Sequence, residues 1–262
     1  MVIKSSSNKF FKFFKSLLSK KNRNIENLFL VEGKKVILES LTYTRPEYVA
    51  MSETFYSDNK NKELVTKISS LCSTYIFTET IFNKLSSTEN SQGIIGYYKQ
   101  LHKTNLKQIK TGRYILLDDV KDPGNAGGII RSADAFSIDG VILTKECVDL
   151  YNPKLIRSTM ASIFRVDIYI LEEKADIASL KDNDFKIVST SIGNAASSYK
   201  YKFNGNLVIV MGNEAKGISD EMLSYSQEKI YIPMNDGIDS LNVNVASSII
   251  MYEMNRDEKA NC

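Results

Sequence analysis

The chain has 262 residues, enough for one large domain or two modest ones. Hydrophobic residues make up 43% and charged residues 25%, as in an ordinary soluble globular protein, and the net charge is a mild +3. No run of about 18 apolar residues occurs, and lysines interrupt the apolar positions near the start. We therefore expect no transmembrane helix, no signal peptide and a cytoplasmic location. Cys72, Cys147 and Cys262 lie far apart and His102 is the only histidine, so we expect no disulfide framework, no His-dependent triad and no metal site.

The first 24 residues carry a block of basic side chains, and no acidic residue precedes Glu26. The block is interleaved with aromatic residues, namely Phe10, Phe11, Phe13 and Phe14. With Leu17 and Leu18, this pattern predicts an amphipathic helix whose apolar stripe packs on its own domain. The basic side chains then either contact RNA, where neutralised phosphates dominate affinity, or are only solvated. The candidate RNA-binding residues are Lys12, Lys15, Lys20, Lys21 and Arg23.

Residues 24–100 alternate between short apolar runs and helical spacing, which predicts a small layered α/β domain. Strands are expected at residues 28–31, 48–51, 75–77 and 93–98, and helices at 34–41, around 64–71 and at 81–85. The sequence then turns polar and basic, which predicts an interdomain linker. We therefore divide the chain into an N-terminal domain at residues 1–100, a linker at 101–113 and a second domain at 114–262.

The second domain is more apolar and more regular. Strands are expected at residues 114–117, 140–143, 166–170, 185–189, 207–211 and 229–232. Helices are expected at 126–136, 153–164, in a stretch after Ser219 and at 241–254. Continuous aliphatic strands are typical of a parallel sheet that is buried on both faces. On the last helix we expect one apolar stripe to form core, namely Leu241, Val245, Ile249 and Tyr252.

Three glycine-containing loops, at residues 122–133, 211–219 and 232–246, follow or end apolar strands. In open α/β sheets, ligands bind at this carboxyl edge. No G-x-G-x-x-G follows a strand, which argues against a nucleotide-dependent oxidoreductase. Gly212 and Gly217 have the spacing of a phosphate loop, but Ile218 replaces its lysine, which argues against an ATPase or kinase. The loops suit S-adenosylmethionine, a ligand without phosphate that needs backbone partners for its adenine and an apolar slot.

Together, the three loops resemble the motifs of the SpoU/TrmH family of RNA ribose 2′-O-methyltransferases, in the SPOUT superfamily. The first motif has an asparagine and an arginine six positions on, here Asn125 and Arg131. The second contains G-x-E, here at residues 212–214, and the third reads I-P-M and then S-L-N, here at 232–234 and 240–242. The match covers residues 114–254, and three motifs in this order are highly specific. Residues 29–34 (FLVEGK) more loosely resemble the ribosomal-protein-like RNA-binding domain that often precedes the catalytic domain in this family.

The resemblance implies an α/β SPOUT domain with a parallel sheet and a C-terminal trefoil knot, S-adenosylmethionine as cofactor and a homodimer through the catalytic domain. The implied catalytic residues are Arg131, Asn125, Glu214, Ser240 and Asn242. The implied cofactor contacts are Thr190, Gly212, Ile232, Met234 and Leu241. Because arginine stays protonated, we expect Arg131 to grip a phosphate and stabilise the developing alkoxide charge.

Several of these residues also have a plainer interpretation. Arg131 would be a surface residue, Glu214 a solvated acid and Asn125 a turn residue. Ser240 and Asn242 would cap the last helix. Thr159 and Ala161 stand where the family usually has serine and glycine; if that glycine admits the RNA, Ala161 would alter substrate choice.

The expected substrate is large-subunit ribosomal RNA. Transfer RNA is the alternative substrate. Methylation of ribosomal RNA that confers antibiotic resistance is a further possible role. From another functional class, a catalytically silent RNA-binding or ribosome-assembly protein is the alternative. The methylated nucleotide cannot be read from the chain.

Overall fold

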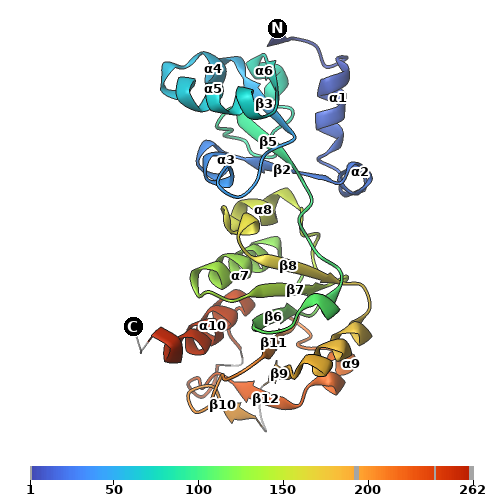
Figure 1. Ribbon diagram of the computed structural model, residues 1–262, viewed down its shortest axis with the longest axis vertical. Helices are drawn as coiled ribbons and strands as arrows, with labels where there is room; N and C mark the ends of the chain where they lie inside the picture. The colour runs from blue at the N-terminus through green and yellow to red at the C-terminus, as the bar shows by residue number, and fades with distance from the viewer. Residues whose placement is uncertain (1, 192–194, 239, 260–262) are drawn as a thin grey trace. The chain divides into compact units, whose positions relative to one another are not determined.

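The computed structural model describes residues 2–191, 195–238 and 240–259 (Figure 1). Cys262, and Asp239 within the third motif, lie outside the described residues. The chain forms two compact units, and a short piece of the second half belongs to the first unit. Unit 1 contains residues 1–101 and 151–164, and unit 2 contains residues 102–150 and 165–262. None of the described helices is long and apolar enough to cross a membrane.

Unit 1 is a five-stranded mixed sheet with helices packed on it. Its elements are β1 (Val2–Ile3), α1 (Lys9–Ser16), α2 (Lys20–Glu26), β2 (Leu28–Glu32), α3 (Lys34–Ser40), β3 (Tyr48–Ser52), α4 (Glu53–Ser57), η1 (Asn59–Asn61), α5 (Lys62–Leu71), β4 (Ser73–Phe77), α6 (Glu79–Phe82), β5 (Ile94–Lys99), α8 (Pro153–Thr159) and η3 (Ser162–Phe164). The strand order is β1-β4-β3-β5-β2, with β5 antiparallel to both of its neighbours.

Helix α1 packs as its pattern predicts. Asn8 caps it by accepting a hydrogen bond from the backbone N–H of Phe10. Phe11, Phe14 and Leu17 are buried in the unit 1 core, and the Phe14 ring stacks on Tyr97 with centroids 4.5 Å apart. The lysines of the same helix are exposed, so the amphipathic interpretation is confirmed.

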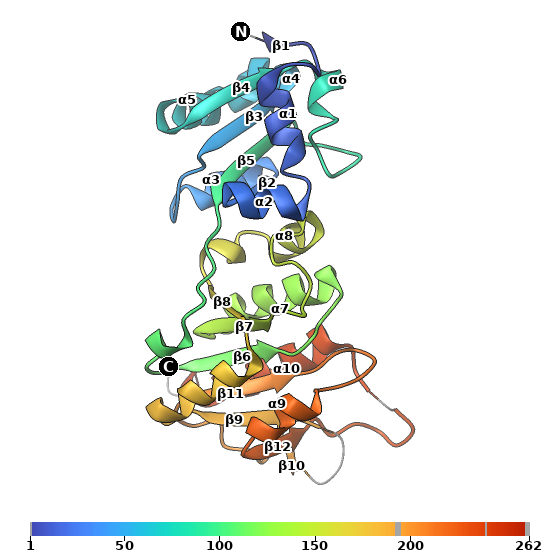
Figure 2. The same ribbon diagram turned by 90° about the vertical axis from the view of Figure 1, so that its right-hand side faces the viewer.

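Unit 2 is a seven-stranded sheet in which every neighbouring pair is parallel. Its elements are η2 (Leu106–Gln108), β6 (Arg113–Leu117), α7 (Pro123–Ala135), β7 (Gly140–Thr144), β8 (Asp167–Leu171), η4 (Lys174–Asn183), β9 (Lys186–Thr190), β10 (Ala196–Ser197), β11 (Leu207–Met211), α9 (Asp220–Tyr225), β12 (Glu228–Tyr231) and α10 (Val243–Lys259). Helices α7 and α10 lie on one face and α9 lies on the other (Figures 1 and 2). The predicted parallel sheet is confirmed, whereas the trefoil knot stays a prediction.

The strand order β10-β12-β9-β11-β6-β7-β8 reverses its direction between β6 and β11. From β6 the chain builds outward through β7 and β8, and the later strands lie on the other side of β6. Parallel sheets bind ligands beyond the strand ends near such a switch point. The topology therefore directs attention to the loops after β9, β11 and β12.

Two expectations about unit boundaries were wrong. The expected linker is part of unit 2 from His102 onward, because Lys103 pairs with β8 through two backbone hydrogen bonds of 2.8 Å. Leu106 and Ile109 are buried in the core of that unit. The helix expected at 153–164 is two short helices, α8 and η3, that belong to unit 1.

The stripe expected to be core on the last helix was also wrong. Val245 and Tyr252 are 47% and 55% exposed. The buried face of α10 is formed instead by Val243, Ile250, Met251 and Met254. Both faces of this helix carry apolar residues at helical spacing, so the period alone could not separate them.

Candidate active site

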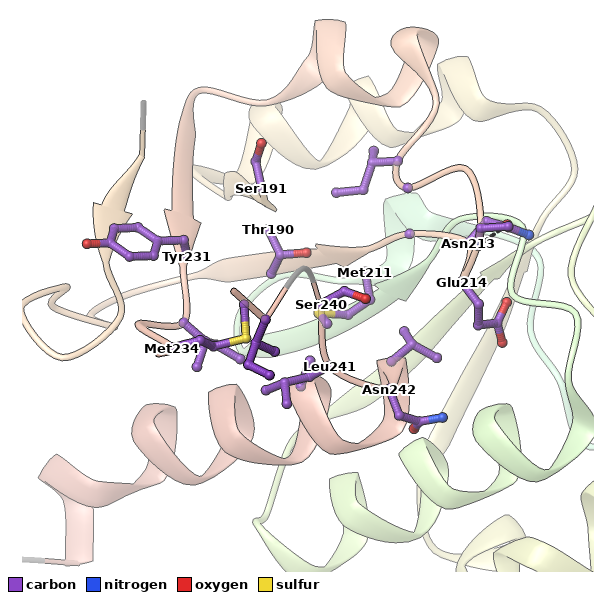
Figure 3. A pocket seen from close by; sticks show the side chains of 18 of the residues that line it. Thr190, Ser191, Met211, Asn213, Glu214, Tyr231, Met234, Ser240, Leu241 and Asn242 are labelled. Atoms are coloured by element: carbon purple, nitrogen blue, oxygen red, sulfur yellow. Dashed lines mark hydrogen bonds between the residues drawn. The ribbon is translucent and has the colours of Figure 1, made fainter. Parts of the chain in front are cut away.

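A pocket with a volume of about 880 Å³ opens at the carboxyl ends of β9, β11 and β12 (Figure 3). Its walls are the ends of these three strands and the loops that follow them, namely residues 190–191, 211–218, 231–232 and 234–238. The start of α10 and the residues before it close the remaining side. The pocket contains all the predicted cofactor residues, namely Thr190, Gly212, Ile232, Met234 and Leu241. Glu214, Ser240 and Asn242 line it as well, whereas Asn125 and Arg131 are not among the lining residues.

The loop after β11 folds back on itself and depends on glycine. Asn213 and Gly217 exchange two backbone hydrogen bonds of 2.9 Å, and the Asn213 side chain accepts from two further N–H groups of the turn. A Cβ on Gly212 would lie 2.3 Å from the carbonyl carbon of Gly217 and 2.4 Å from the nitrogen of Ile218. Any side chain there must push this backbone away, because real Cβ contacts are essentially never so short. Gly212 thus permits the loop itself, in addition to leaving room for a ligand.

A buried ion pair anchors the far end of this loop. Asp118, directly after β6, is fully buried and lies 2.7 Å from the Lys174 Nζ. Its other oxygen accepts 2.7 Å hydrogen bonds from both the backbone N–H and the hydroxyl of Ser219, the N-cap of α9. Burial alone would lower the pKa of Lys174, but its pairing with Asp118 outweighs burial and raises it. No local sequence pattern signals this cluster, since its three residues are distant along the chain.

Three predicted catalytic residues form one hydrogen-bonded chain. The Asn242 Oδ1 accepts from the backbone N–H of Asn244 and Val245 and so caps α10. Its amide nitrogen donates to the Asn125 Oδ1 at 3.0 Å, and the Asn125 amide nitrogen donates to the Glu214 carboxylate at 2.8 Å. Because capping uses the Asn242 oxygen, that residue can only donate to Asn125. The direction of both amides is therefore set, and the Glu214 carboxylate faces a donor.

This chain joins all three motifs. Asn125 lies in the first turn of α7, where its backbone N–H is bonded by the N-cap Asp122. Glu214 comes from the loop after β11, and Asn242 precedes α10. The plain reading of Asn242 as a cap holds together with its contact to Asn125, whereas Ser240 forms part of the pocket wall. Asn125 and Glu214 are more than a turn residue and a solvated acid, since each bonds another motif.

Arg131 lies apart from this cluster. It is exposed on α7. Six residues at about 100° each place it roughly 240° around the helix from Asn125. The single chain therefore does not bring Arg131 to the pocket that holds the other motif residues. Its exposure leaves the guanidinium accessible to a phosphate from outside.

The described walls of the pocket combine apolar and polar residues and carry few charges. Glu214, Asp236 and Lys216 are the charged members among the described lining residues. Apolar side chains of Met211, Ile232 and Leu241 supply the slot. Two carboxylates against one ammonium suit a cationic ligand and do not form a site for a polyphosphate.

Among the candidate RNA-binding residues, the structure separates Arg23 from the others. Lys12, Lys15, Lys20 and Lys21 are exposed. Arg23 is only 3% exposed, and its guanidinium donates to the carbonyls of Leu17 and Leu18 at 3.0 and 2.8 Å. These bonds close the turn between α1 and α2, so we assign Arg23 to the fold and not to an RNA surface.

The two departures from the family pattern are inside the protein. Thr159 is fully buried, and its hydroxyl donates to the Ile156 carbonyl at 2.8 Å. Ala161 is 1% exposed in unit 1. The methyl group of Ala161 is therefore packed against protein, which removes the reason to expect it to alter RNA approach.

The fold and the site together define an α/β protein whose second unit has an all-parallel sheet, with a pocket of few charged residues at the carboxyl ends of its strands near the topological switch point. Comparison with known proteins agrees with the motifs. Residues 112–252 match the SpoU rRNA Methylase family, and residues 8–96 match the MRM3-like substrate binding domain. The chain belongs to the SpoU rRNA methylase family.

Similar proteins cover nearly the whole chain. The 23S rRNA (guanosine(2553)-2'-O)-methyltransferase RlmP of Bacillus subtilis is 30% identical over 96% of this chain and 98% of its own. The crystal structure of an AdoMet-bound rRNA methyltransferase from Sinorhizobium meliloti is 25% identical, with a TM-score of 0.87 over 98% of both chains. A putative RNA methyltransferase of the TrmH family from Porphyromonas gingivalis is 26% identical, with a TM-score of 0.82 over 94% of this chain and 97% of its own.

Proposed function

We propose that this protein transfers a methyl group from S-adenosylmethionine to a ribose 2′-hydroxyl of ribosomal RNA from the large subunit. The observation that carries the proposal is the pocket, which gathers all the predicted cofactor residues and places the Asn242–Asn125–Glu214 chain at one side. The AdoMet-bound relative of the same fold supports the cofactor, and the relative from Bacillus subtilis supports the 2′-hydroxyl and the ribosomal substrate.

The pocket fits this cofactor chemically. When bound, S-adenosylmethionine supplies an electrophilic methyl group on a positive sulfonium. The apolar walls exclude water from that group, and the carboxylates of Glu214 and Asp236 offset its positive charge. In our proposal, the backbone at Gly212, Ile232 and Met234, which line the pocket, supplies the partners of the adenine.

In our proposal, the motif chain orients the nucleophile and Arg131 acts on the RNA. Glu214, held by the Asn125 amide, accepts a hydrogen bond from the ribose hydroxyl. This bond orients the hydroxyl oxygen toward the methyl group. Arg131 is exposed outside the pocket, where it grips a phosphate of the same RNA and so fixes the position of the ribose. The hydroxyl proton passes along that hydrogen bond to the Glu214 carboxylate, which is exposed and releases it to water.

We place RNA recognition on unit 1 as well. The exposed lysines of α1 and α2 lie in the part of the chain that matches a substrate-binding domain. Such lysines gain affinity by releasing counterions from the phosphate backbone. Ribosomal RNA is available in the cytoplasm, which is where we place the reaction.

We further propose a homodimer through unit 2. The face of α10 that carries Val245 and Tyr252 is apolar and exposed, and the Tyr252 ring contacts Phe136 from the end of α7. An exposed apolar face of this kind is costly in water unless another protein surface covers it. Sedimentation of the full-length protein tests this: Tyr252→Glu should shift a dimer to monomer, and an unchanged mass would contradict it.

The test of the function uses the full-length protein, S-adenosylmethionine with a labelled methyl group, and total RNA from a strain that lacks the gene. We expect calorimetry to show cofactor binding and label to enter large-subunit RNA as 2′-O-methyl nucleotides that resist alkaline hydrolysis. Label in transfer RNA would redirect the substrate. Cofactor binding or RNA binding without transfer would instead identify a silent RNA-binding protein.

A further inference from the structure

An exposed segment rich in lysine and tyrosine lies at the edge of the unit 2 sheet, beside the pocket. It begins at the edge strand β10, which pairs with β12. The backbone N–H of Ser198 donates to the carbonyl of Tyr231 at 2.9 Å, and Tyr231 lines the pocket. Figure 3 shows Tyr231 projecting from β12 at the margin of the pocket. The segment is thus fastened to a strand whose end forms part of the pocket wall.

Residues 199–203 of this segment include both exposed side chains and side chains that pack against the protein. The Tyr201 and Phe203 rings contact each other edge to face with centroids 4.9 Å apart, and Phe203 is buried. The residues between and before them are exposed, namely Tyr199, Lys200 and Lys202. Tyr199 is 60% exposed, which is the largest exposed fraction among the described tyrosines. The anchors hold the backbone, so the exposed ring is presented without being needed for the core.

The charge around Tyr199 is positive. Lys229, on the neighbouring strand β12, is exposed as well. The adjacent acid, Glu228, is occupied by Lys186 at 2.9 Å. Among the residues that the structure describes, Lys200, Lys202 and Lys229 form no ion pair. Their charge is therefore available to an anionic partner.

We propose that Tyr199, Lys200 and Lys202 bind unpaired nucleotides of the RNA substrate beside the methyl-transfer pocket. This inference rests on the proposed function and adds a second RNA contact outside unit 1. An exposed ring stacks on a base only when that base has left its own helix, and neighbouring lysines bind the phosphates of the same strand. The surface therefore selects single-stranded RNA next to the reacting ribose.

The test measures binding of two RNA ligands to the full-length protein. One is a single strand of about 20 nucleotides, which is long enough to span one such surface, and the other is the blunt duplex of the same sequence. We expect Tyr199→Ala to weaken single-strand binding roughly 5- to 100-fold, as typical for loss of one stacked base, and Tyr199→Trp to retain it. The double variant Lys200→Gln/Lys202→Gln should reduce the slope of log affinity against log salt by about 1.4, since each lost contact with a single strand removes about 0.7. Affinity for S-adenosylmethionine should stay the same in all three variants.

Matched controls are Lys181→Gln, which removes an exposed lysine elsewhere in unit 2, and Tyr56→Ala, which removes an exposed tyrosine from unit 1. Parental affinity and salt slope in the Tyr199 and lysine variants would overturn the inference, as would an equal loss on the duplex. Methyl transfer by the unmodified protein is measured in parallel. If that transfer is absent while the variants still lose single-strand binding, the proposed function fails and the binding surface stands.

Discussion

The hydrogen bond between Asn125 and Glu214 allows an almost isosteric perturbation. Asn125→Asp keeps the oxygen that accepts from Asn242, but it replaces the amide that donates to Glu214 at 2.8 Å with a carboxylate oxygen. Two ionised carboxylates at that distance repel by about 1.5 kcal/mol even at the dielectric constant of water. The lost bond to a charged group is worth about 1.5 to 3 kcal/mol when buried, and because Glu214 is exposed we count only a fraction of it.

The sum, about 2 kcal/mol, corresponds to a loss of methyl transfer of roughly 30-fold at neutral pH. The carboxylate pair also gives the variant a distinctive pH dependence. Repulsion between the two carboxylates makes it easier for the pair to take up one proton. Once the introduced carboxyl holds that proton, it can again donate a hydrogen bond to Glu214. Relative to the unmodified protein, the activity of the variant should therefore rise as the pH falls.

The assay is methyl transfer at saturating S-adenosylmethionine across a pH series, with cofactor affinity measured separately. That affinity should change little, because Asn125 is not among the residues that line the pocket. Asn59→Asp, at an exposed position of unit 1 that is remote in sequence from the motifs and from the lysines of α1 and α2, controls for the added charge. A variant with the parental rate and the parental pH profile would refute the orienting role of the motif chain.

Three further predictions concern the other parts of the site. Arg131→Ala should lower methyl transfer on the order of 100-fold or more while cofactor affinity stays within a few-fold. Arg131→Lys should restore little activity, because a point charge does not reproduce the planar, bidentate contact of a guanidinium with a phosphate. Parental transfer in the alanine variant would reject the assignment. Gly212→Leu should abolish cofactor binding in calorimetry by opening the loop at Gly217. The control Gly205→Ala strains a backbone with φ +76° but meets nothing within 4 Å and lies outside the pocket lining, so it should leave binding intact. Retained binding in the leucine variant would show that the loop tolerates the change. Neutralising the exposed lysines of α1 and α2 should weaken RNA binding and flatten its salt dependence, and an unchanged slope would show that they are only solvated; the positions are Lys12, Lys15, Lys20 and Lys21.

Sequence patterns located the central strands of unit 2 well, because β6, β7 and β11 are buried on both faces and consist mainly of aliphatic residues, whereas the short edge strand β10 was not expected. The run at β11, for example, is entirely buried and was expected at the residues where it occurs. The three loops met as expected since the carboxyl ends of parallel strands share one edge. Because these loops lie together, hydrogen bonds from Asn242 to Asn125 and from Asn125 to Glu214 can form. Which amide donates could not be predicted from the sequence, because it depends on the Asn242 oxygen capping α10.

Other features could not be read from the sequence because hydrogen bonds and ion pairs produce no apolar period. Helix α2 has a single large apolar residue, Ile25, which is 66% exposed. What holds that segment is the cap by Ser19 and the buried guanidinium of Arg23, and neither produces an apolar period. In the same way, Asp118 after β6 pairs with Lys174, which lies beyond two further strands in the chain, so its role could not be read locally.

The assignment of residues 151–164 to unit 1 sets a rule for recombining this protein with its relatives. The chain passes between the units at three points, after residues 101, 150 and 164. The Phe29 ring lies 4.7 Å from Tyr151, and the Tyr98 ring lies 4.9 Å from Phe164. A graft that exchanges only the first 101 residues would therefore pair these rings with foreign partners. A functional chimera has to carry residues 151–164 together with the N-terminal sequence, as a single discontinuous module.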